Sequence, residues 1–256
     1  MTSDTTTDID TTTDDRQRKI VLVTGASSGI GASTGRRLAA AGHHVVLAAR
    51  RTNRLAEIVE DLTAQGCSAE ALELDVTDHS AFVAAVDAVV AEHGRIDVYV
   101  GNAGIMLLSR LDALLVEQWD RMFDVNVRGL YHGVAAVLPH FTRQGGGHVV
   151  TMASVGAHEV PPTSAIYSAT KHAAWALSEG LRIESPGSIR VTTVCPGVTE
   201  SELADHITDD HAVEAMRTYR ASAIPASAIA DAVAYAVDQP VSVDVNEIIV
   251  RPSRQR

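Results

Sequence analysis

The sequence contains almost no cysteine. Cys67 and Cys195 are the only two cysteines in 256 residues, and they stand far apart and outside any C-x-x-C spacing. This scarcity argues against a disulfide framework, a cysteine zinc site and a dithiol redox pair. We expect both residues to be reduced, buried thiols.

Long apolar runs and clusters of basic residues are also missing. No run approaches the roughly 18 apolar residues of a membrane span, and the first residues lack the apolar centre of a signal peptide. The formal net charge is −11, and lysine and arginine are dispersed along the chain. The sequence therefore predicts a cytoplasmic protein that binds a small molecule rather than nucleic acid or a membrane.

The composition favours one globular domain. Of the residues, 46% are apolar and 21% are charged, which at this length allows one large core. Residues 1–18 are mainly threonine and aspartate and cannot bury enough apolar surface to offset the entropy of ordering. We expect a disordered tail over 1–18 and a catalytic domain over 19–256.

Short apolar runs rich in valine, isoleucine and leucine recur along this domain, and stretches with apolar residues at helical spacing separate them. Near-continuous runs of this kind favour strands of a parallel sheet buried on both faces. The sequence predicts a single α/β, doubly wound Rossmann-type domain, with ligands at the carboxyl ends of the strands. The seven predicted strands are KIVLVTG (19–25), HHVVLAAR (43–50), AEALELD (69–75), DVYVGNAG (97–104), HVVTMAS (148–154), IRVTTVCPG (189–197) and NEIIVRP (246–252).

Residues 198–225 interrupt this alternation. They combine acidic residues and two histidines with scattered apolar residues such as Leu203 and Ile207. We interpret the segment as a short helical excursion over the ligand site, placed to act as a lid.

A glycine-rich turn with the spacing G-x-x-x-G-x-G follows the first predicted strand. Glycines permit a tight turn and a close approach of the backbone to a pyrophosphate, whose charge faces the N–H groups of a helix start. We predict that the turn binds dinucleotide phosphates; the alternative is an ordinary glycine-rich connection. The residues concerned are Gly25, Ser27, Ser28, Gly29, Ile30 and Gly31.

The end of the second predicted strand indicates which dinucleotide binds. Ala49 stands where an NAD-specific fold has an acid for the ribose 2′-hydroxyl, and Arg50 and Arg51 follow. A guanidinium suits a 2′-phosphate, so we predict NADP(H) as the cofactor, with Arg50 as the main contact. The alternative for either arginine is a solvated charge at a strand end.

Further motifs complete a pattern that resembles the short-chain dehydrogenase/reductase family over Lys19 to Pro252. They are Asp75-Val76, Asn102-Ala103-Gly104, Asn126 in DVNVRG, Ser154, Tyr167-Ser168-Ala169-Thr170-Lys171 and Pro196-Gly197. The resemblance implies a catalytic tetrad of Asn126, Ser154, Tyr167 and Lys171. It also implies that Asp75 and Val76 lie at the adenine, that 102–104 lie along the cofactor ribose, and that Pro196, Gly197 and Thr199 lie beside the nicotinamide.

The chemistry of carbonyl reduction explains the tetrad. A carbonyl that accepts hydride develops alkoxide character, so its oxygen needs a proton donor and a hydrogen bond. Tyr167 would donate the proton, and Lys171, one helical turn later, would stabilise the phenolate of a phenol whose ordinary pKa is about 10. By resemblance, Lys171 also holds ribose hydroxyls, Ser154 hydrogen-bonds the substrate oxygen, and Asn126 holds a water that relays protons.

Each of these residues also has a structural alternative. Ser154 could be a turn residue at a strand end, Asn126 an amide that bonds the backbone within a helix, and Tyr167 a core ring. The eleven histidines show no ligand spacing such as H-E-x-x-H, so we predict no metal site.

The sequence departs from the family pattern in two places. Gly101 replaces the usual first asparagine of NNAG and removes a side chain that ties the central strands together, with a modest expected effect. Thr199 and Ser201 replace the usual aliphatic residue and threonine after Pro-Gly, which weakens the expected contact with the nicotinamide carboxamide.

The resemblance also implies a homotetramer, or a dimer. Consistent with this, the long helix predicted from Asp112 to about Arg143 and the helix beginning at Tyr167 carry apolar faces on more than one side. Such faces could pair across two-fold axes.

Substrate selectivity must come from side chains around the reacting carbon. NAGIMLL, GVTESELADHIT and NEIIVRP are similar to a bacterial branch with NADP-dependent reductases of specialised metabolism, such as clavulanic acid aldehyde reductase, and 3-hydroxy acid dehydrogenases. The candidate substrate residues are mostly apolar, which favours a carbonyl compound of modest size. They are Ile105, Met106, Val155, His158, Val160, Leu203, His206 and Ile207.

Three functions therefore compete: a reductase of aldehydes or ketones, an alcohol or hydroxy-acid dehydrogenase working oxidatively, and a cofactor-binding sensor without catalysis. The presence of Ser154, Tyr167 and Lys171 argues against the sensor. Because cellular NADP pools are usually reduced, we favour reduction.

Overall fold

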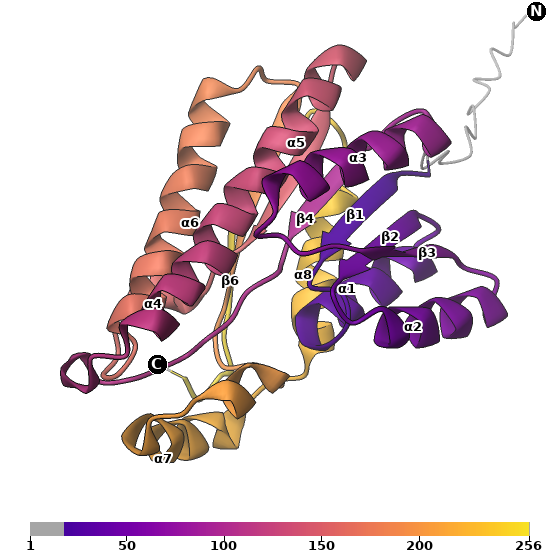
Figure 1. Cartoon of the computed structure of the whole chain (residues 1–256). Helices are drawn as coiled ribbons and strands as arrows, with labels where there is room; N and C mark the ends of the chain where they lie inside the picture. The colour runs from indigo at the N-terminus through magenta and orange to yellow at the C-terminus, as the bar shows by residue number, and fades with distance from the viewer. Residues whose placement is uncertain (1–17, 256) are drawn as a thin grey trace, which may run out of the picture.

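The computed structural model describes residues 18–255 and places seven parallel strands in one sheet (Figure 1). The strand order is β3-β2-β1-β4-β5-β6-β7, so the chain changes direction across the sheet between β1 and β4. This confirms the predicted doubly wound α/β fold and its seven strands. The strands are β1 (Ile20–Thr24), β2 (His44–Ala49), β3 (Ser68–Glu73), β4 (Val98–Gly101), β5 (Gly147–Met152), β6 (Ile189–Pro196) and β7 (Glu247–Val250).

Helices cover both faces of the sheet. Successive residues of β1 point to opposite faces, so Val21 and Val23 pack with α1, α2 and α8, whereas Ile20 and Leu22 pack with α3, α5 and α6. The shorter α4 and α7 lie beyond the carboxyl ends of the strands (Figure 1). The helices are α1 (Gly29–Ala40), α2 (Thr52–Ala64), α3 (His79–His93), α4 (Val116–Phe123), α5 (Gly129–Gln144), α6 (Ala165–Glu184), α7 (Asp210–Tyr219) and α8 (Ala226–Val237).

The long helix predicted from Asp112 to about Arg143 begins later and is less regular than expected. Leu114 adopts a left-handed backbone conformation with φ of 52° and separates a 3-10 turn over Leu111–Ala113 from α4. Between α4 and α5, residues Asp124–Arg128 form a π-helical turn. Such turns often occur at functional sites, and this one carries Asn126.

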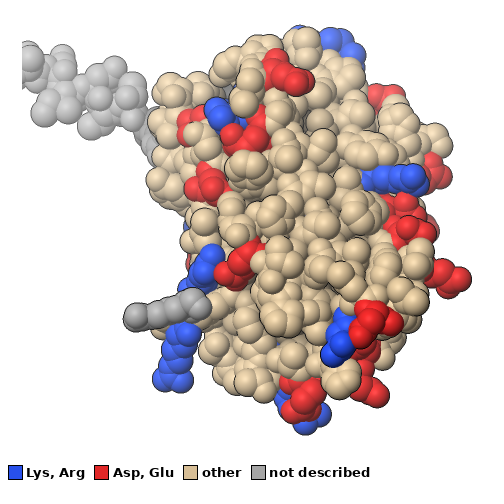
Figure 2. Space-filling view, turned by 90° about the vertical axis from the view of Figure 1, so that its left-hand side faces the viewer, with Lys and Arg blue, Asp and Glu red and all other residues tan. Residues whose placement is uncertain are grey.

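The face formed by α4, α5 and α6 exposes several apolar side chains. In the view onto this side of the molecule, charged residues lie mainly toward the margins and other residues occupy the middle (Figure 2). The exposed apolar residues of these helices are Val116, Phe123, Tyr131, Leu177 and Ile183. The two helical regions expected to present apolar faces therefore do so.

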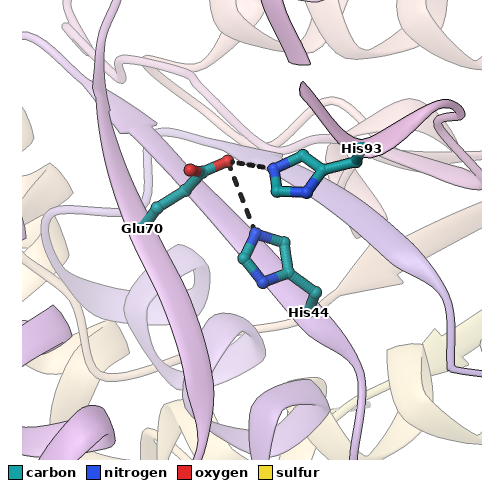
Figure 3. A group of neighbouring side chains, drawn as sticks. All are labelled: His44, Glu70 and His93. Carbon is teal, nitrogen blue, oxygen red and sulfur yellow. Dashed lines mark hydrogen bonds and ion pairs between the residues drawn. The ribbon is translucent and has the colours of Figure 1, made fainter. Parts of the chain in front are cut away.

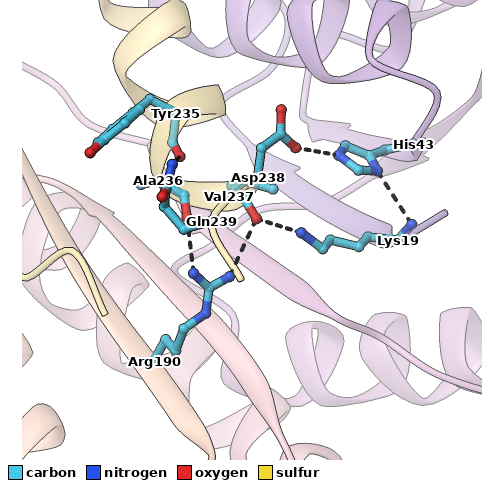
Figure 4. A network of polar contacts seen from close by, with 8 residues as sticks. All are labelled: Lys19, His43, Arg190, Tyr235, Ala236, Val237, Asp238 and Gln239. Carbon is cyan, nitrogen blue, oxygen red and sulfur yellow. Dashed lines mark hydrogen bonds and ion pairs between the residues drawn. The ribbon is translucent and has the colours of Figure 1, made fainter. Parts of the chain in front are cut away.

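Buried Arg190 holds the carboxyl end of α8 (Figure 4). Its guanidinium donates to the carbonyl oxygens of Ala236 at 3.0 Å and Val237 at 3.3 Å, and Lys19 Nζ also donates to the Val237 oxygen. The last carbonyls of a helix have no partner within the helix, and cations are favourable there. The start of β1 and the start of β6 are thus both tied to the end of α8, at the amino ends of the strands and opposite the ligand site.

The predicted tail lies almost entirely beyond what the structure describes, since residues 1–17 fall outside it. Its last residue, Arg18, is placed, and its guanidinium lies 3.3 Å from Nδ1 of His44. Within 18–255, no helix is long and apolar enough to cross a membrane.

Candidate functional site

A cavity of about 620 Å³ lies at the carboxyl ends of the strands. This volume is within the range of about 300–1,000 Å³ that is typical of small-molecule sites. Every residue predicted to contact the cofactor lines it. These are Gly25, Ser27, Ser28, Gly29, Ile30, Gly31, Arg50, Arg51, Asp75, Val76, Asn102, Ala103, Gly104, Tyr167, Lys171, Pro196, Gly197 and Thr199.

The glycine turn between β1 and α1 leaves no room for side chains. Gly25 and Gly29 have φ angles of 65° and 54°, in the left-handed region that favours glycine. A Cβ atom on Gly31 would lie 2.4 Å from the Gly25 carbonyl oxygen. Ser28 caps α1 without a hydrogen bond from its side chain to the first turn, so the first N–H groups of α1 face the cavity rim.

Hydrogen bonds between the carboxyl ends of β1 and β4 support this turn. Asn102 Nδ2 donates to the Thr24 carbonyl oxygen at 2.8 Å, and the Thr24 hydroxyl donates to the Val100 carbonyl oxygen at 3.2 Å. The Thr24 hydroxyl also accepts from the Asn102 N–H at 3.1 Å. Thr24 and Asn102 therefore link β1 to the end of β4.

Gly101 is glycine for a steric reason. A Cβ atom there would lie 2.7 Å from Leu130 Cδ1 and 3.1 Å from the Tyr99 hydroxyl oxygen. The departure from NNAG is thus matched to the bulk of Tyr99 and Leu130, which occupy the space beside it.

Arg51, rather than Arg50, reaches the glycine turn. Arg51 donates to the hydroxyls of Ser27 at 3.0 Å and Ser28 at 2.6 Å. The Arg50 side chain is 69% exposed, and its guanidinium lies 3.9 Å from the Asp75 carboxylate. Both arginines line the cavity, but only Arg51 contacts the turn, so the assignment of Arg50 to the 2′-phosphate stays a prediction.

Glu202 closes over this cation. One of its carboxylate oxygens lies 2.8 Å from Arg51 Nη1, and the other pairs with Arg54. Hydrogen bonds from Arg51 and Arg54 lower the pKa of Glu202 to about 2, so it is ionised at neutral pH. Glu202 begins the 3-10 turn Glu202–His206 within the segment 198–225. Its ion pairs therefore connect this segment to the cofactor side of the cavity.

Ser154 and Tyr167 meet at the cavity wall. Ser154 follows β5, and its Oγ accepts a hydrogen bond from the Gly156 N–H at 3.0 Å. Tyr167 lies in the first turn of α6. Burial raises the pKa of the Tyr167 phenol to about 12, although a hydrogen bond with Ser154 acts in the opposite direction.

Lys171 lies one turn after Tyr167 and is buried. Its Nζ donates to the Met152 carbonyl oxygen at 2.8 Å and lies 5.8 Å from the centre of the Tyr167 ring. Burial lowers the pKa of Lys171 to about 8. Its hydrogen bond therefore goes to the backbone of β5 rather than to the Tyr167 hydroxyl, and the expected lowering of the Tyr167 pKa by Lys171 is not seen.

Asn126 does not line the cavity but lies directly behind it. Its Oδ1 accepts from the Ile105 N–H at 2.8 Å, and its Nδ2 donates to the Ile105 carbonyl at 2.9 Å and to Thr170 Oγ1 at 3.0 Å. A Cβ atom on Gly104 would lie 3.3 Å from Asn126 Oδ1 and 3.7 Å from Lys171 Nζ. Asn126 therefore braces the end of β4 against α6, beside Lys171.

Five of the eight candidate substrate residues line the cavity: Ile105, Met106, Val155, Leu203 and His206. The other three do not. Val160 is exposed, and Ile207 is buried in a cluster with Leu108 and Ala212. His158 is turned toward the far edge of the sheet, where its Nε2 lies 2.7 Å from Glu247 and 3.6 Å from Cys195 Sγ.

Sequence reasoning missed several cavity residues. Met216 and Tyr219 of α7 line the cavity together with Leu108 and Arg220. Ala212, Met216 and Tyr219 follow helical i, i+4, i+7 spacing, which was the available signal. Thr199 lines the cavity as expected, but its hydroxyl donates to the Gly197 carbonyl at 3.1 Å.

Comparison with known proteins relates this chain to known oxidoreductases. The short chain dehydrogenase family model matches residues 19–212. An uncharacterized oxidoreductase of Staphylococcus saprophyticus is 40% identical over 240 residues, which cover 93% of this chain and 97% of that protein.

Solved structures share the whole fold. An alcohol dehydrogenase from the archaeon Thermococcus sibiricus, complexed with 5-hydroxy-NADP, is 29% identical with a TM-score of 0.84, and the match covers 94% of this chain and 99% of the other. A serine dehydrogenase complexed with NADP+ is 31% identical with a TM-score of 0.80, covering 90% and 94% of the two chains. On the strength of the family match and the near full-length relative, this chain belongs to the short chain dehydrogenase family of oxidoreductases.

Proposed function

We propose that this protein transfers hydride between NADP(H) and the carbonyl or alcohol carbon of a small molecule, and that it works mainly as a reductase. The carrying observation is the pairing of the Tyr167 and Ser154 hydroxyls at the wall of a cavity that also contains the glycine turn. This pairing supports our assignment of Tyr167 as the proton donor and Ser154 as the hydrogen-bond donor to a developing alkoxide.

The residues present fit a nicotinamide dinucleotide. Gly29, where a Cβ would meet only Ser201 at 3.5 Å, leaves the turn open beside the first N–H groups of α1, and this arrangement suits a pyrophosphate. When bound, the cofactor supplies or accepts the hydride. The proposed contacts of this chain are the glycine turn, Arg51, Asp75, Asn102 and Lys171.

Tyr167 is the proposed proton donor. Burial raises the pKa of its phenol to about 12, so it is protonated at neutral pH in this structure. After it donates its proton to the carbonyl oxygen, Lys171 is the cation placed to stabilise the phenolate, and Ser154 holds the product oxygen. We propose that Asn126 supports this arrangement by holding Ile105 and α6 in place.

Two observations favour NADP(H) over NAD(H). Arg51 presents a guanidinium beside Ser27 and Ser28, and the residue at the end of β2 is Ala49 rather than an acid. The two structural neighbours described above also carry NADP or a derivative of it. We therefore assign the 2′-phosphate to Arg51, with Arg54 beside it.

The oxidative alternative remains a second candidate because two neighbours bear the names alcohol dehydrogenase and serine dehydrogenase. In that direction Tyr167 would act as the base, and because one group serves both directions of a reaction, the ratio of reduced to oxidised cofactor decides between them. The mainly apolar lining formed by Ile105, Met106, Leu108 and Met216 favours a carbonyl compound of modest size. We propose that the substrate is a carbonyl compound of specialised metabolism, as for the reductases that the sequence resembles.

Consumption of NADPH tests the proposal directly. We expect the absorbance of NADPH to fall with at least one member of a panel of aldehydes, ketones and β-keto acids, and to fall more slowly with NADH. Incubation of NADP+ with the matching alcohols tests the oxidative direction in parallel. Tight NADPH binding with no turnover of any compound in either direction would favour the sensor instead.

Lys171 should make cofactor binding depend on pH. With its pKa lowered to about 8, the side chain is an ammonium at pH 7 and becomes neutral as the pH rises above 8. Exchange of a charged for a neutral hydrogen-bond donor costs about 1 kcal/mol, or about fivefold in Kd. Fluorescence titration should show the Kd of NADPH rising about fivefold between pH 7 and 9.5, whereas a parallel rise in Lys171→Met would exclude Lys171 as the cause.

We also propose that the chain assembles as a homotetramer, or a dimer, through the apolar face of α4, α5 and α6 (Figure 2). Exposed Phe123, Tyr131, Leu177 and Ile183 give this face an apolar surface that a second copy would cover. Sedimentation velocity of the full chain separates these states from a monomer.

A further inference from the structure

Three potential metal ligands converge at the amino end of the sheet, opposite the cavity (Figure 3). His44 is the first residue of β2, Glu70 lies in β3 and His93 is the last residue of α3. Ser68, at the start of β3, pairs with His44 in the strand register. None of these residues lines the cavity, so the proposed oxidoreductase function leaves the cluster unexplained.

The spacing of the three side chains suits a small ion. His93 Nε2 lies 2.9 Å and His44 Nε2 lies 3.4 Å from the same Glu70 oxygen, and the three ligand atoms lie within 4.8 Å of one another. A tetrahedral Zn²⁺ with bonds of about 2.0–2.1 Å holds neighbouring ligand atoms about 3.3 Å apart. The two nitrogen–oxygen distances differ from this spacing by a few tenths of an ångström.

A second observation, made on His44 itself, also points to a metal ion. The His44 side chain is 9% exposed, and its Nε2 is a buried nitrogen without a hydrogen-bond partner in the described structure. Buried polar atoms of this kind are costly and uncommon. Nε2 is the same atom that points toward Glu70, so the unpartnered nitrogen faces the centre of the cluster.

The other nitrogen of His44 is already held. Nδ1 lies 2.7 Å from Ser68 Oγ, which can accept the Nδ1 proton and leave the Nε2 lone pair for a metal. Arg18 donates to the same Ser68 Oγ, and its Nη2 also lies 3.3 Å from Nδ1. Because a guanidinium can only donate, metal binding at Nε2 requires Ser68 Oγ to accept from both Arg18 and the Nδ1 proton. Ser68 thus orients the ring in the way that outer hydrogen bonds orient histidine ligands in metal sites.

We propose that His44, Glu70 and His93 form a binding site for a divalent transition-metal ion of the zinc type. Two imidazoles and one carboxylate suit Zn²⁺ better than Mg²⁺ or Ca²⁺. The partial exposure of Glu70 and His93 leaves a fourth position for water. A bound ion would link β2, β3 and the end of α3, so it would stabilise the folded chain without entering the cavity.

The test is metal binding by the full chain, measured with Zn²⁺ by calorimetry and with Co²⁺ by the visible absorption of tetrahedral Co²⁺. We expect the parent to bind Zn²⁺ at this site and to melt at a higher temperature when Zn²⁺ is added. His44→Gln and His93→Gln should each weaken this binding more than tenfold and remove the thermal shift. Ser68→Ala, which leaves all three ligands in place, should weaken it about tenfold, as loss of an outer hydrogen bond does.

Two control variants make the assignment specific. His211→Gln removes an exposed histidine of α7, and His158→Gln removes a histidine of the second cluster, His158, Cys195 and Glu247. Both should retain the binding that His44→Gln loses. A parent that binds neither metal would overturn the proposal, as would a site lost in His158→Gln but kept in His44→Gln. NADPH turnover is not a readout here, so failure of this proposal and failure of the proposed function remain separate.

Discussion

Tyr167→Phe is expected to lower kcat for carbonyl reduction by about a thousandfold, within the range typical of a lost general acid. The variant removes one hydroxyl from the cavity wall and keeps the ring, so the packing of α6 should persist. The Kd of NADPH should change by less than about twofold, because the phenol contributes its proton to the reaction rather than its bulk to binding. Stopped-flow absorbance with the carbonyl substrate found in the panel measures the first quantity, and fluorescence titration measures the second.

Tyr235→Phe is the matched control for this prediction. Tyr235 lies near the end of α8, and its side chain is exposed. Its carbonyl oxygen, which the substitution leaves in place, accepts a hydrogen bond from Gln239 at 2.9 Å. Loss of the Tyr235 hydroxyl should leave kcat unchanged. Turnover by Tyr167→Phe within tenfold of the parent would mean that the proton comes from elsewhere, and a matching fall in Tyr235→Phe would indicate a general effect on the fold.

The features that sequence analysis predicted well depend on local chemistry. The central strands are recognisable because burial on both faces demands continuous valine, isoleucine and leucine, as in β1 and β2. The glycine turn is recognisable because Gly25 and Gly31 occupy positions where a Cβ does not fit. Tyr167 and Lys171 lie one turn apart on α6, so their proximity follows from helical geometry alone.

Side-chain directions at turns could not be predicted in this way. Arg50 and Arg51 are adjacent in sequence, and only the backbone path into α2 determines that Arg51 crosses to Ser27. His158 follows Ser154 closely, but the 3-10 turn Val155–Ala157 rotates it away from the cavity toward Glu247. The direction of a side chain at such positions depends on a few backbone angles that composition does not encode.

Contacts between distant segments were also beyond sequence reasoning. The cluster of His44, Glu70 and His93 depends on the register of β2 with β3 and on where α3 ends. The hydrogen bonds of Asn126 to Ile105 and Thr170 depend on the π-helical turn, which the apolar pattern of the helix does not reveal. Both cysteines were expected to be buried thiols, but only Cys195 is buried, where it contacts Glu247, whereas Cys67 is half-buried.

Arg51→Ala is expected to weaken NADPH binding about a hundredfold and NADH binding less than about threefold. Each hydrogen bond to a charged group contributes about 1.5–3 kcal/mol, so two bonds to a 2′-phosphate amount to at least about 3 kcal/mol, or two orders of magnitude in Kd. NADH lacks that phosphate and should sense only the loss of the contacts with Ser27 and Ser28. Fluorescence titration of both cofactors measures the ratio.

Arg50→Ala is the control that separates the two neighbouring arginines. Its side chain is 69% exposed, compared with 41% for Arg51, and solvent-exposed charges contribute little to binding or stability. We expect its loss to weaken NADPH binding less than about fivefold. If Arg50→Ala instead had the larger effect, the 2′-phosphate would belong to the residue next to Asp75, as the sequence alone indicated.

Because Glu202 bonds Arg51 and Arg54 in this structure, Glu202→Gln should moderately tighten NADPH binding by removing an anion that competes with the phosphate. The same fluorescence titration measures this change.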